Sequence, residues 1–225
     1  MYNKIMPAKN NNLKIHTDDL EINYQPKYKI CISGAAETTH CAERASEMAE
    51  EMGRVIAKRG MVLVTGATVG LPYWAAKGAK QAGGMVIGFS PAASKSAHIN
   101  SYRLPTDYHD VIVYTGFDYS GRNLILTRAS DAVVTICGRM GTLNEFTIAF
   151  EDRKPQGILT GSGGTADQIK EIVEEAHRGQ GKIIYDNDPE KLMDKLVALI
   201  EEDEKTKYER RVDIVPMDVS KKKRG

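Results

Sequence analysis

The stretch whose residues are best suited to binding or catalysis is the run over 137–145, which reads CGRMGTLNE. It follows an apolar run that predicts a buried strand, and it leads into a predicted helix whose apolar side includes Leu143 and Phe146. Free backbone N–H groups and the positive end of the helix dipole attract anions at such a helix start. Glycines allow this backbone to approach a ligand closely. The loop therefore predicts an anion-binding site.

Glycine-containing turns follow three further apolar runs, at 28–33, 61–65 and 157–160. If these runs are parallel strands, their turns meet at the sheet edge where ligands of such folds bind. The turns together favour an extended ligand that carries phosphate. The residues that we expect to bind it are Ser33, Gly34, Gly66, Thr68, Gly70, Gly138, Arg139, Gly141, Thr142, Gly161 and Gly163.

Short apolar runs and helical periodicities alternate along the chain from residue 27. The alternation predicts an α/β fold, with a Rossmann-like, doubly wound parallel sheet in a three-layer α/β/α single domain. The predicted strands are 28–33, 61–65, 85–89, 111–114, 132–137, 157–160 and 182–185, and the clearest predicted helices are 38–59, 117–130 and the segment from 189. The helix at 117–130 is expected to turn Leu124, Ile125 and Ala129 inward.

Three segments fall outside this alternation. Residues 1–26 are polar and predict a flexible N-terminal arm, 27–205 form the predicted nucleotide-binding domain, and 206–225 predict a charged C-terminal tail. The segment 90–110 has no clear period, which is typical of a functional or mobile loop. Its two histidines, His98 and His109, are expected to be solvated.

Composition limits the classes of function. The 225 residues are 41% hydrophobic and 27% charged, with a net charge of +1, which gives no general attraction to nucleic acid or membranes. No apolar run reaches the length of a membrane span, and the N-terminus lacks a secretory pattern. The three cysteines, Cys31, Cys41 and Cys137, are scattered along the sequence, so we expect neither a disulfide framework nor a zinc site. This use of cysteine fits a reducing compartment, and we expect a cytoplasmic protein.

Several cofactor motifs do not match. The turn 34–37, GAAE, does not fit the GxGxxG fingerprint of dinucleotide-binding proteins, and no Walker A sequence is present. No lysine stands in a context that suits a pyridoxal-phosphate Schiff base. We therefore expect no resident cofactor and no metal, and interpret the glycine turns as binding a free ligand.

The run over 137–145 resembles the PGGxGTxxE signature of the LOG family, once described as "lysine decarboxylase-like", which includes cytokinin-activating nucleoside-5′-monophosphate phosphoribohydrolases. Residues 66–71 and the glycines at 78 and 83–84 are similar to a second family segment, and 120–123 fall at a third. The turn 160–164, TGSGG, is similar to a branch related to plant molybdenum-cofactor carrier proteins, which bind without catalysing. The resemblance covers most of 27–201.

This resemblance implies roles for particular residues. Gly138, Gly141 and Thr142 would hold a 5′-phosphate, and Glu145 would stabilise an oxocarbenium-like ribose and orient the attacking water. Arg122 would lie beside the leaving base or the phosphate and stabilise charge, because an arginine is a poor proton donor. The family also implies a homodimer.

The chain departs from the family pattern at three positions. Cys137 replaces a proline, Arg139 replaces a glycine, and Asn123 stands where a lysine is usual. These changes weaken the case for hydrolysis more than the case for phosphate binding. Three structural alternatives stay open: Thr142 and Glu145 form only a helix-capping box, Arg122 is a surface residue, or the segment 66–70 is only a tight strand–helix turn. Arg128 and Asp131 are a candidate structural pair.

Two functions from different classes follow. The first is a nucleoside-5′-monophosphate phosphoribohydrolase that cleaves the N-glycosidic bond of a purine nucleotide to free base and ribose 5-phosphate, with Glu145 and Arg122 as catalytic residues. The alternative is a non-catalytic carrier or sensor of a nucleotide or a molybdopterin-like cofactor. DNA binding, as in the distantly related DprA proteins, is disfavoured by the near-neutral charge.

Overall fold

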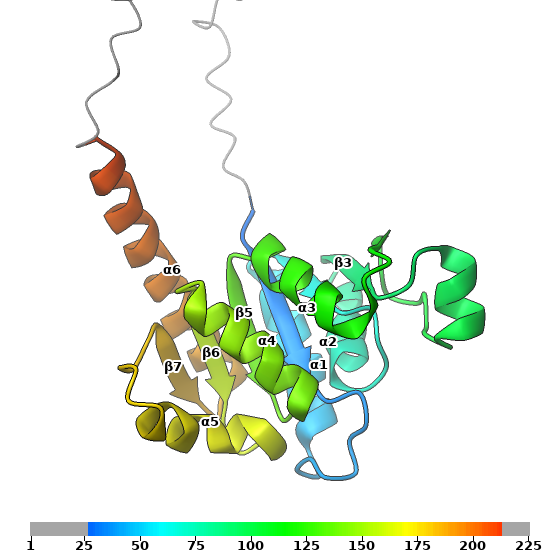
Figure 1. The fold of residues 1–225 in the computed structure, drawn as a ribbon, viewed down its shortest axis with the longest axis horizontal. Helices are drawn as coiled ribbons and strands as arrows, with labels where there is room; N and C mark the ends of the chain where they lie inside the picture. Colours follow the sequence, from blue (N-terminus) through cyan, green and yellow to red (C-terminus); the bar gives the residue numbers. More distant parts are fainter. Residues whose placement is uncertain (1–26, 213–225) are drawn as a thin grey trace, which may run out of the picture.

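A computed structural model describes residues 27–212 of the chain, and a seven-stranded parallel sheet lies at its centre (Figure 1). Every pair of neighbouring strands is parallel, and the order across the sheet is β4-β3-β2-β1-β5-β6-β7. The strands are β1 (Lys29–Gly34), β2 (Val62–Thr65), β3 (Met85–Ser90), β4 (Val111–Tyr114), β5 (Ala132–Ile136), β6 (Gln156–Leu159) and β7 (Ile183–Asp186). The predicted α/β fold is confirmed.

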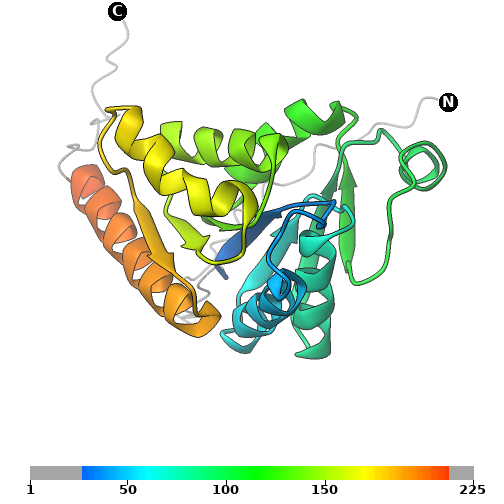
Figure 2. The same cartoon turned by 90° about the horizontal axis from the view of Figure 1, so that it is seen from below.

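Helices cover both faces of the sheet. Figure 2 shows α3, α4 and α5 on one face and α1, α2 and α6 on the other. The helices are α1 (Ala45–Lys58), α2 (Leu71–Gln81), α3 (Asp118–Ala129), α4 (Met140–Glu151), α5 (Gly164–Glu175) and α6 (Pro189–Val212). Within residues 27–212 no helix is both long and apolar enough to cross a membrane.

The core lies in two layers because successive strand residues point to opposite faces. Ile30 and Ile32 of β1 belong to the larger cluster, which packs against α1, α2 and α6. Cys31, between them, belongs to a smaller cluster that includes Leu126 of α3 and Ala149 of α4. Both faces of the central strands are thus buried, which explains their continuous apolar sequences.

The order of the strands creates a switch point beside β1. The chain builds outward from β1 through β2 and β3 to β4, and then returns so that β5 pairs with the free side of β1. Loops that follow β1 and β5 therefore leave the sheet side by side and in opposite directions. In folds of this kind, ligands bind in the crevice at this position.

The segment 90–110 differs from the predicted irregular loop. It contains a short π-helix, η2 (Ala97–Ser101), and stands out from the sheet at the β4 side in both Figure 1 and Figure 2. The prediction of a solvated His98 is wrong, because its imidazole is fully buried between the hydroxyl of Ser90, at 2.8 Å, and the carbonyl of Pro105, at 2.9 Å. His109 is partly buried, and its Nε2 lies 2.7 Å from the hydroxyl of Thr65.

Two further expectations need correction. Leu124 is exposed, and α3 instead buries Arg122, Asn123, Leu126 and Thr127. Arg128 pairs with Asp152 at 3.0 Å rather than with Asp131, whose carboxylate accepts from Lys29 at 2.7 Å. Asp131 lies beyond the end of α3 at Ala129, so its spacing of three residues from Arg128 does not put the two side chains on one helix face.

The first helix begins at Ala45, although helical spacing predicted it from 38. Residues 35–44 form a loop instead, and a disulfide between Cys41 and Cys137 joins it to the end of β5. The expectation of no disulfide is therefore wrong. At the other end, α6 continues to Val212, past the predicted domain limit at 205. The predicted arm over 1–26 and the tail beyond 212 lie outside the described residues, and the division into arm, domain and tail stays a prediction.

Candidate functional site

A cavity of about 190 Å³ opens at the switch point, where β1, β2 and β5 end. It is bounded by the loop after β1, the turn after β2, the N-terminal parts of α3 and α4, and the start of α2. Its lining residues are Ile32, Gly34, Ala35, Ala36, Gly66, Thr68, Pro72, Tyr119, Arg122, Asn123, Arg139, Gly141, Thr142 and Glu145. The glycine loop that the sequence singles out therefore contributes directly to the cavity.

The loop after β5 and the first turn of α4 contribute Arg139, Gly141 and Thr142 to the cavity lining. Gly138 has a φ of +103°, a conformation that favours glycine, and Arg139 is extended before α4 begins. The first hydrogen bond at the start of α4 runs from the N–H of Leu143 to the carbonyl of Arg139, at 2.9 Å. The N–H groups of 140–142 precede it and have no acceptor within the helix. This geometry attracts an anion.

The capping-box alternative for Thr142 and Glu145 is wrong. The residue that caps α4 is Arg139, no side chain makes a capping hydrogen bond there, and Thr142 is already the third residue of the helix. Both Thr142 and Glu145 are buried on the side of α4 that faces the cavity. Their positions are explained by the cavity and not by the helix end.

Glu145 is the buried carboxylate of the site, with 7% of its surface exposed. Its Oε2 accepts a hydrogen bond from the hydroxyl of Ser33, and its Oε1 lies 3.5 Å from Nη1 of Arg122. Burial raises the pKa of Glu145, and the guanidinium of Arg122 and the Ser33 hydroxyl oppose that rise without cancelling it.

Arg122 lies inside the protein and not on its surface, since only 5% of the residue is exposed. Its guanidinium passes directly over Gly66 and lies 5.9 Å from the ring centre of Tyr119, one turn earlier on α3. Its Nε is buried and has no hydrogen-bond partner among the described residues. A buried guanidinium with an unused donor is suited to an anionic ligand.

Asn123 completes the polar wall of the cavity. In the amide orientation that places its nitrogen toward acceptors, this nitrogen lies 2.9 Å from Oε1 of Glu145 and 2.9 Å from the carbonyl of Tyr119. An asparagine at this position supplies a neutral donor where the family pattern has a cation. Glu145 therefore has three neighbours that can donate to it: Ser33, Arg122 and Asn123.

The turn after β2 supports the opposite wall. Gly70 has a φ of +77°, and a Cβ at this position would fall 2.2 Å from the carbonyl oxygen of Ala35. The same carbonyl accepts from the N–H of Leu71 at 2.9 Å, which ties the loop after β1 to the start of α2. Thr68 and Pro72 line the cavity next to this junction.

The structure brings most of the predicted site residues together. Gly34, Gly66, Thr68, Arg122, Arg139, Gly141, Thr142 and Glu145 line the cavity. Ser33, Gly70 and Gly138 lie directly behind its wall and hold lining residues in place.

Gly161 and Gly163 do not line the cavity. Their N–H groups donate to the carboxylate of Asp167, at 2.7 and 3.0 Å, so this turn already has an internal anion. Sequence reasoning missed Tyr119, Ala35, Ala36 and Pro72. Tyr119 was detectable in principle, because it precedes Arg122 by three residues and so shares its helix face.

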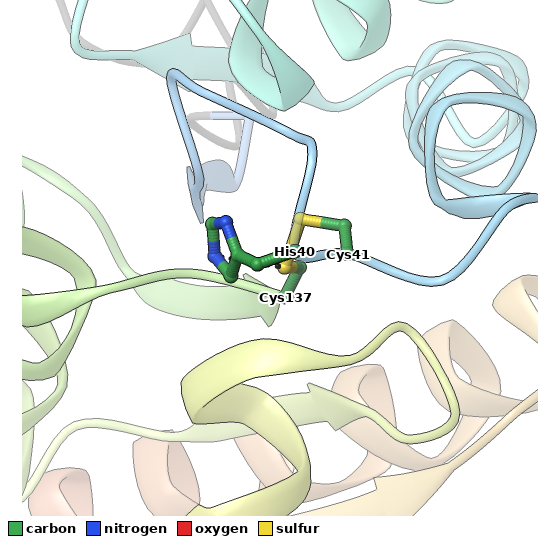
Figure 3. A group of neighbouring side chains, drawn as sticks. All are labelled: His40, Cys41 and Cys137. Atoms are coloured by element: carbon green, nitrogen blue, oxygen red, sulfur yellow. Dashed lines mark hydrogen bonds between the residues drawn. A yellow bond between two sulfur atoms is a disulfide. The ribbon is translucent and has the colours of Figure 1, made fainter.

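No cluster of three metal-ligating side chains lies inside this cavity. Among residues 27–212, the group of His40, Cys41 and Cys137 is the one whose ligand atoms lie within 4.8 Å of one another. It lies behind the glycine loop, and Figure 3 shows its three side chains.

A parallel sheet with a small cavity at its switch point, lined by the charged side chains of Arg122 and Glu145, defines a Rossmann-like, ligand-binding type of protein. The chain belongs to the SLOG cluster4 family, which matches residues 27–193. The resemblance to LOG-like proteins is thereby confirmed.

Individual relatives agree with this assignment. An uncharacterized protein of Archaeoglobus fulgidus is 32% identical over 126 residues, which are 56% of this chain and 76% of that protein. The molybdenum cofactor binding protein of Rippkaea orientalis is 26% identical with a TM-score of 0.66, over 79% of this chain and 99% of that one. The molybdenum cofactor carrier protein of Chlamydomonas reinhardtii is 27% identical with a TM-score of 0.63, over 78% and 99%.

Proposed function

We propose that the chain binds a phosphate-bearing pterin or nucleotide in the cavity at the switch point and carries it without cleaving it. The observation behind this proposal is the buried guanidinium of Arg122, whose Nε lacks a partner among the described residues and which lines the cavity with the start of α4. A buried cation and free backbone N–H groups together favour a ligand with a dense negative charge.

The size of the cavity limits how much of the ligand it encloses. Pockets that enclose a whole drug-sized ligand have volumes of about 300–1,000 Å³, and this cavity has about 190 Å³. We infer that the phosphate end enters and the ring system stays near the mouth. Tyr119, 47% exposed and beside Arg122, offers an aromatic face for that ring system.

The named relatives support a pterin as the cargo. Two similar structures belong to proteins described as a binding protein and a carrier protein for the molybdenum cofactor. The residues present here fit the anionic end of such a molecule, because Arg122 lines the cavity together with Gly141 and Thr142 from the first turn of α4. Tyr119 and Pro72 supply apolar surface next to them.

The surroundings of Glu145 favour carriage over cleavage. A carboxylate that orients an attacking water needs an oxygen free to accept from it. Oε2 of Glu145 accepts from Ser33, and Oε1 faces Arg122 and Asn123. We infer that Glu145 chiefly holds the guanidinium of Arg122 in place.

A phosphoribohydrolase is the second candidate function. It is favoured by the neighbouring side chains of Glu145 and Arg122. Cleavage of an N-glycosidic bond builds positive charge on the ribose, and the carboxylate of Glu145 would offset it. Arg122 would neutralise the phosphate or the leaving base. This activity requires a bound nucleotide to displace Asn123 or Arg122 from Oε1. The homodimer that the family resemblance implies also stays a prediction.

Calorimetric titration with AMP, GMP and molybdopterin tests the proposal, with chromatography of the same samples for free base. We expect saturable binding without base release. Arg122→Ala is expected to weaken binding about 10- to 100-fold, as for a lost charged hydrogen bond. Arg128→Ala, on the exposed side of the same helix, is the matched control and should bind like the parent.

The outcomes separate the two functions. Base release by the parent but not by Glu145→Gln would replace carriage by hydrolysis. Equal binding by Arg122→Ala and the parent would refute the proposed site, because the anion would then lie elsewhere.

A further inference from the structure

The disulfide between Cys41 and Cys137 joins two loops that leave neighbouring strands. Cys41 lies in the loop after β1, and Cys137 directly follows β5 at the start of the glycine loop (Figure 3). Cys137 is fully buried, and Cys41 is partly buried. Neither residue has a part in the ligand-binding role proposed above, so the pair calls for its own explanation.

A histidine stands next to this pair. Nε2 of His40 lies 3.6 Å from Sγ of Cys137, and the ligand atoms of His40, Cys41 and Cys137 all lie within 4.8 Å of one another. In a tetrahedral zinc site, bond lengths of about 2.3 Å to sulfur and about 2.05 Å to nitrogen place the two ligand atoms about 3.6 Å apart. The imidazole is thus already at ligand spacing from one sulfur.

A carboxylate lies on the other side of the same imidazole. Oε2 of Glu37 is 3.6 Å from Nδ1 of His40, and Oε1 accepts from the N–H of Thr39 at 2.7 Å. Metal-binding histidines commonly donate their second ring N–H to a carboxylate, which fixes the tautomer and the ring orientation.

We propose that reduction of the disulfide converts His40, Cys41 and Cys137 into a binding site for a zinc-like metal ion. An external dithiol reduces the bond: it gives two electrons and two protons, forms its own cyclic disulfide, and leaves two cysteine thiols. A divalent ion then displaces the two thiol protons and accepts both thiolates and Nε2 of His40. The fourth position is taken by water, as in sites with three protein ligands.

Reduction itself creates the space that the metal needs. Two thiolate ligands in a tetrahedral site lie about 3.8 Å apart. Sulfur atoms that are no longer bonded must separate by a comparable distance, and the loop at 35–44 carries Cys41 and is joined to β5 through this bond. In the disulfide form, Nε2 of His40 also lies 3.2 Å from the carbonyl of Gly138, an acceptor that a metal-bound imidazole would give up.

Cobalt(II) is the probe for the test, because thiolate ligation in a tetrahedral site gives intense visible bands and a sulfur-to-metal charge-transfer band. The full-length protein is reduced, freed of reductant without air and titrated. We expect both kinds of band at one equivalent in the reduced parent and none in the oxidised protein. Zinc should abolish the bands by displacement.

Variants assign the ligands. Cys41→Ser and His40→Ala should lose the charge-transfer intensity or the tetrahedral visible bands, and Glu37→Gln should bind about 10- to 100-fold more weakly. Cys31→Ala, which removes the remaining cysteine from the core, is the control and should keep the parent spectrum.

Circular dichroism shows whether each variant is folded. Because His40 is exposed, His40→Ala removes a proposed ligand without changing the core. Absence of thiolate bands in the folded, reduced parent would overturn the proposal. An unchanged spectrum in folded His40→Ala or Cys41→Ser would overturn it as well.

Discussion

The guanidinium of Arg122 lies against the backbone of Gly66, so closely that a Cβ at residue 66 would fall 1.7 Å from Nη1. Arg122 on α3 can therefore be buried in this position only because residue 66, directly after β2, has no side chain. Gly66 makes room for Arg122, and Oε1 of Glu145 lies 3.5 Å from the same nitrogen. Three segments far apart in the sequence thus define the position of one charge.

Gly66→Ala should displace Arg122 from the cavity. We expect a loss of stability of about 1–3 kcal/mol, as for an overpacked interior, together with weaker binding of the phosphate-bearing ligand. Urea unfolding and calorimetry measure the two effects. Gly157→Ala is the control, since a Cβ there meets Leu192 only at ordinary contact distance, 3.4 Å. Parent-like ligand affinity in Gly66→Ala would contradict this account.

Glu145 should make stability depend on pH. Its pKa is raised in the folded protein, so the stabilisation from the protonated form is fully present below the ordinary carboxyl pKa and is lost as pH rises through the folded value. Glu145→Gln removes this loss. The variant should therefore gain stability relative to the parent as pH increases above the ordinary carboxyl pKa, in unfolding curves at each pH. Parallel pH profiles would refute the assignment.

The disulfide should contribute measurably to stability. It closes a loop with a sequence separation of 96, and disulfides of this kind contribute about 2–4 kcal/mol. In metal-free buffer, reduction should lower the free energy of unfolding of the parent by about this amount, and the midpoint of urea unfolding should fall accordingly. Cys41→Ser should match the reduced parent and not respond to reductant. A parent that unfolds identically in both redox states would show that the bond adds nothing.

Asp167→Ala tests whether the second glycine turn binds phosphate. We expect a loss of about 1–2 kcal/mol, because the N–H groups of Gly161 and Gly163 lose their acceptor as at a helix cap. Ligand affinity should stay unchanged, because this turn does not line the cavity. An increase in affinity would mean that the freed N–H groups receive the phosphate, and it would restore both glycines to the site.

Sequence reasoning succeeded where local pattern and fold topology agree. Apolar runs predicted all seven strands, and parallel strands bring the turns after β1, β2 and β5 to one edge. This is why Gly34, Gly66 and Thr142, which are distant in sequence, could be predicted to share one cavity.

It failed where a contact depends on the exact path of a loop. The spacing of Cys41 and Cys137 gives no sign that the loop after β1 returns to the end of β5. His98 was misjudged for a similar reason, because its partners Ser90 and Pro105 surround it only once the π-helix η2 forms. The predicted helix at 38–59 also began too early: its apolar positions start at Ala45, where α1 begins, and the residues before it form a loop that the disulfide joins to Cys137.

The bond between Cys41 and Cys137 turns the segment between them into a covalent ring. That ring contains β2, β3, β4 and the protruding segment around η2. A protease that cuts once within 90–110 would open the ring without releasing a fragment, and the two pieces would part on a gel only after reduction. The segment 90–110 would thus stay attached after a single cut, and the two cysteines that close the ring lie next to the loops that border the cavity.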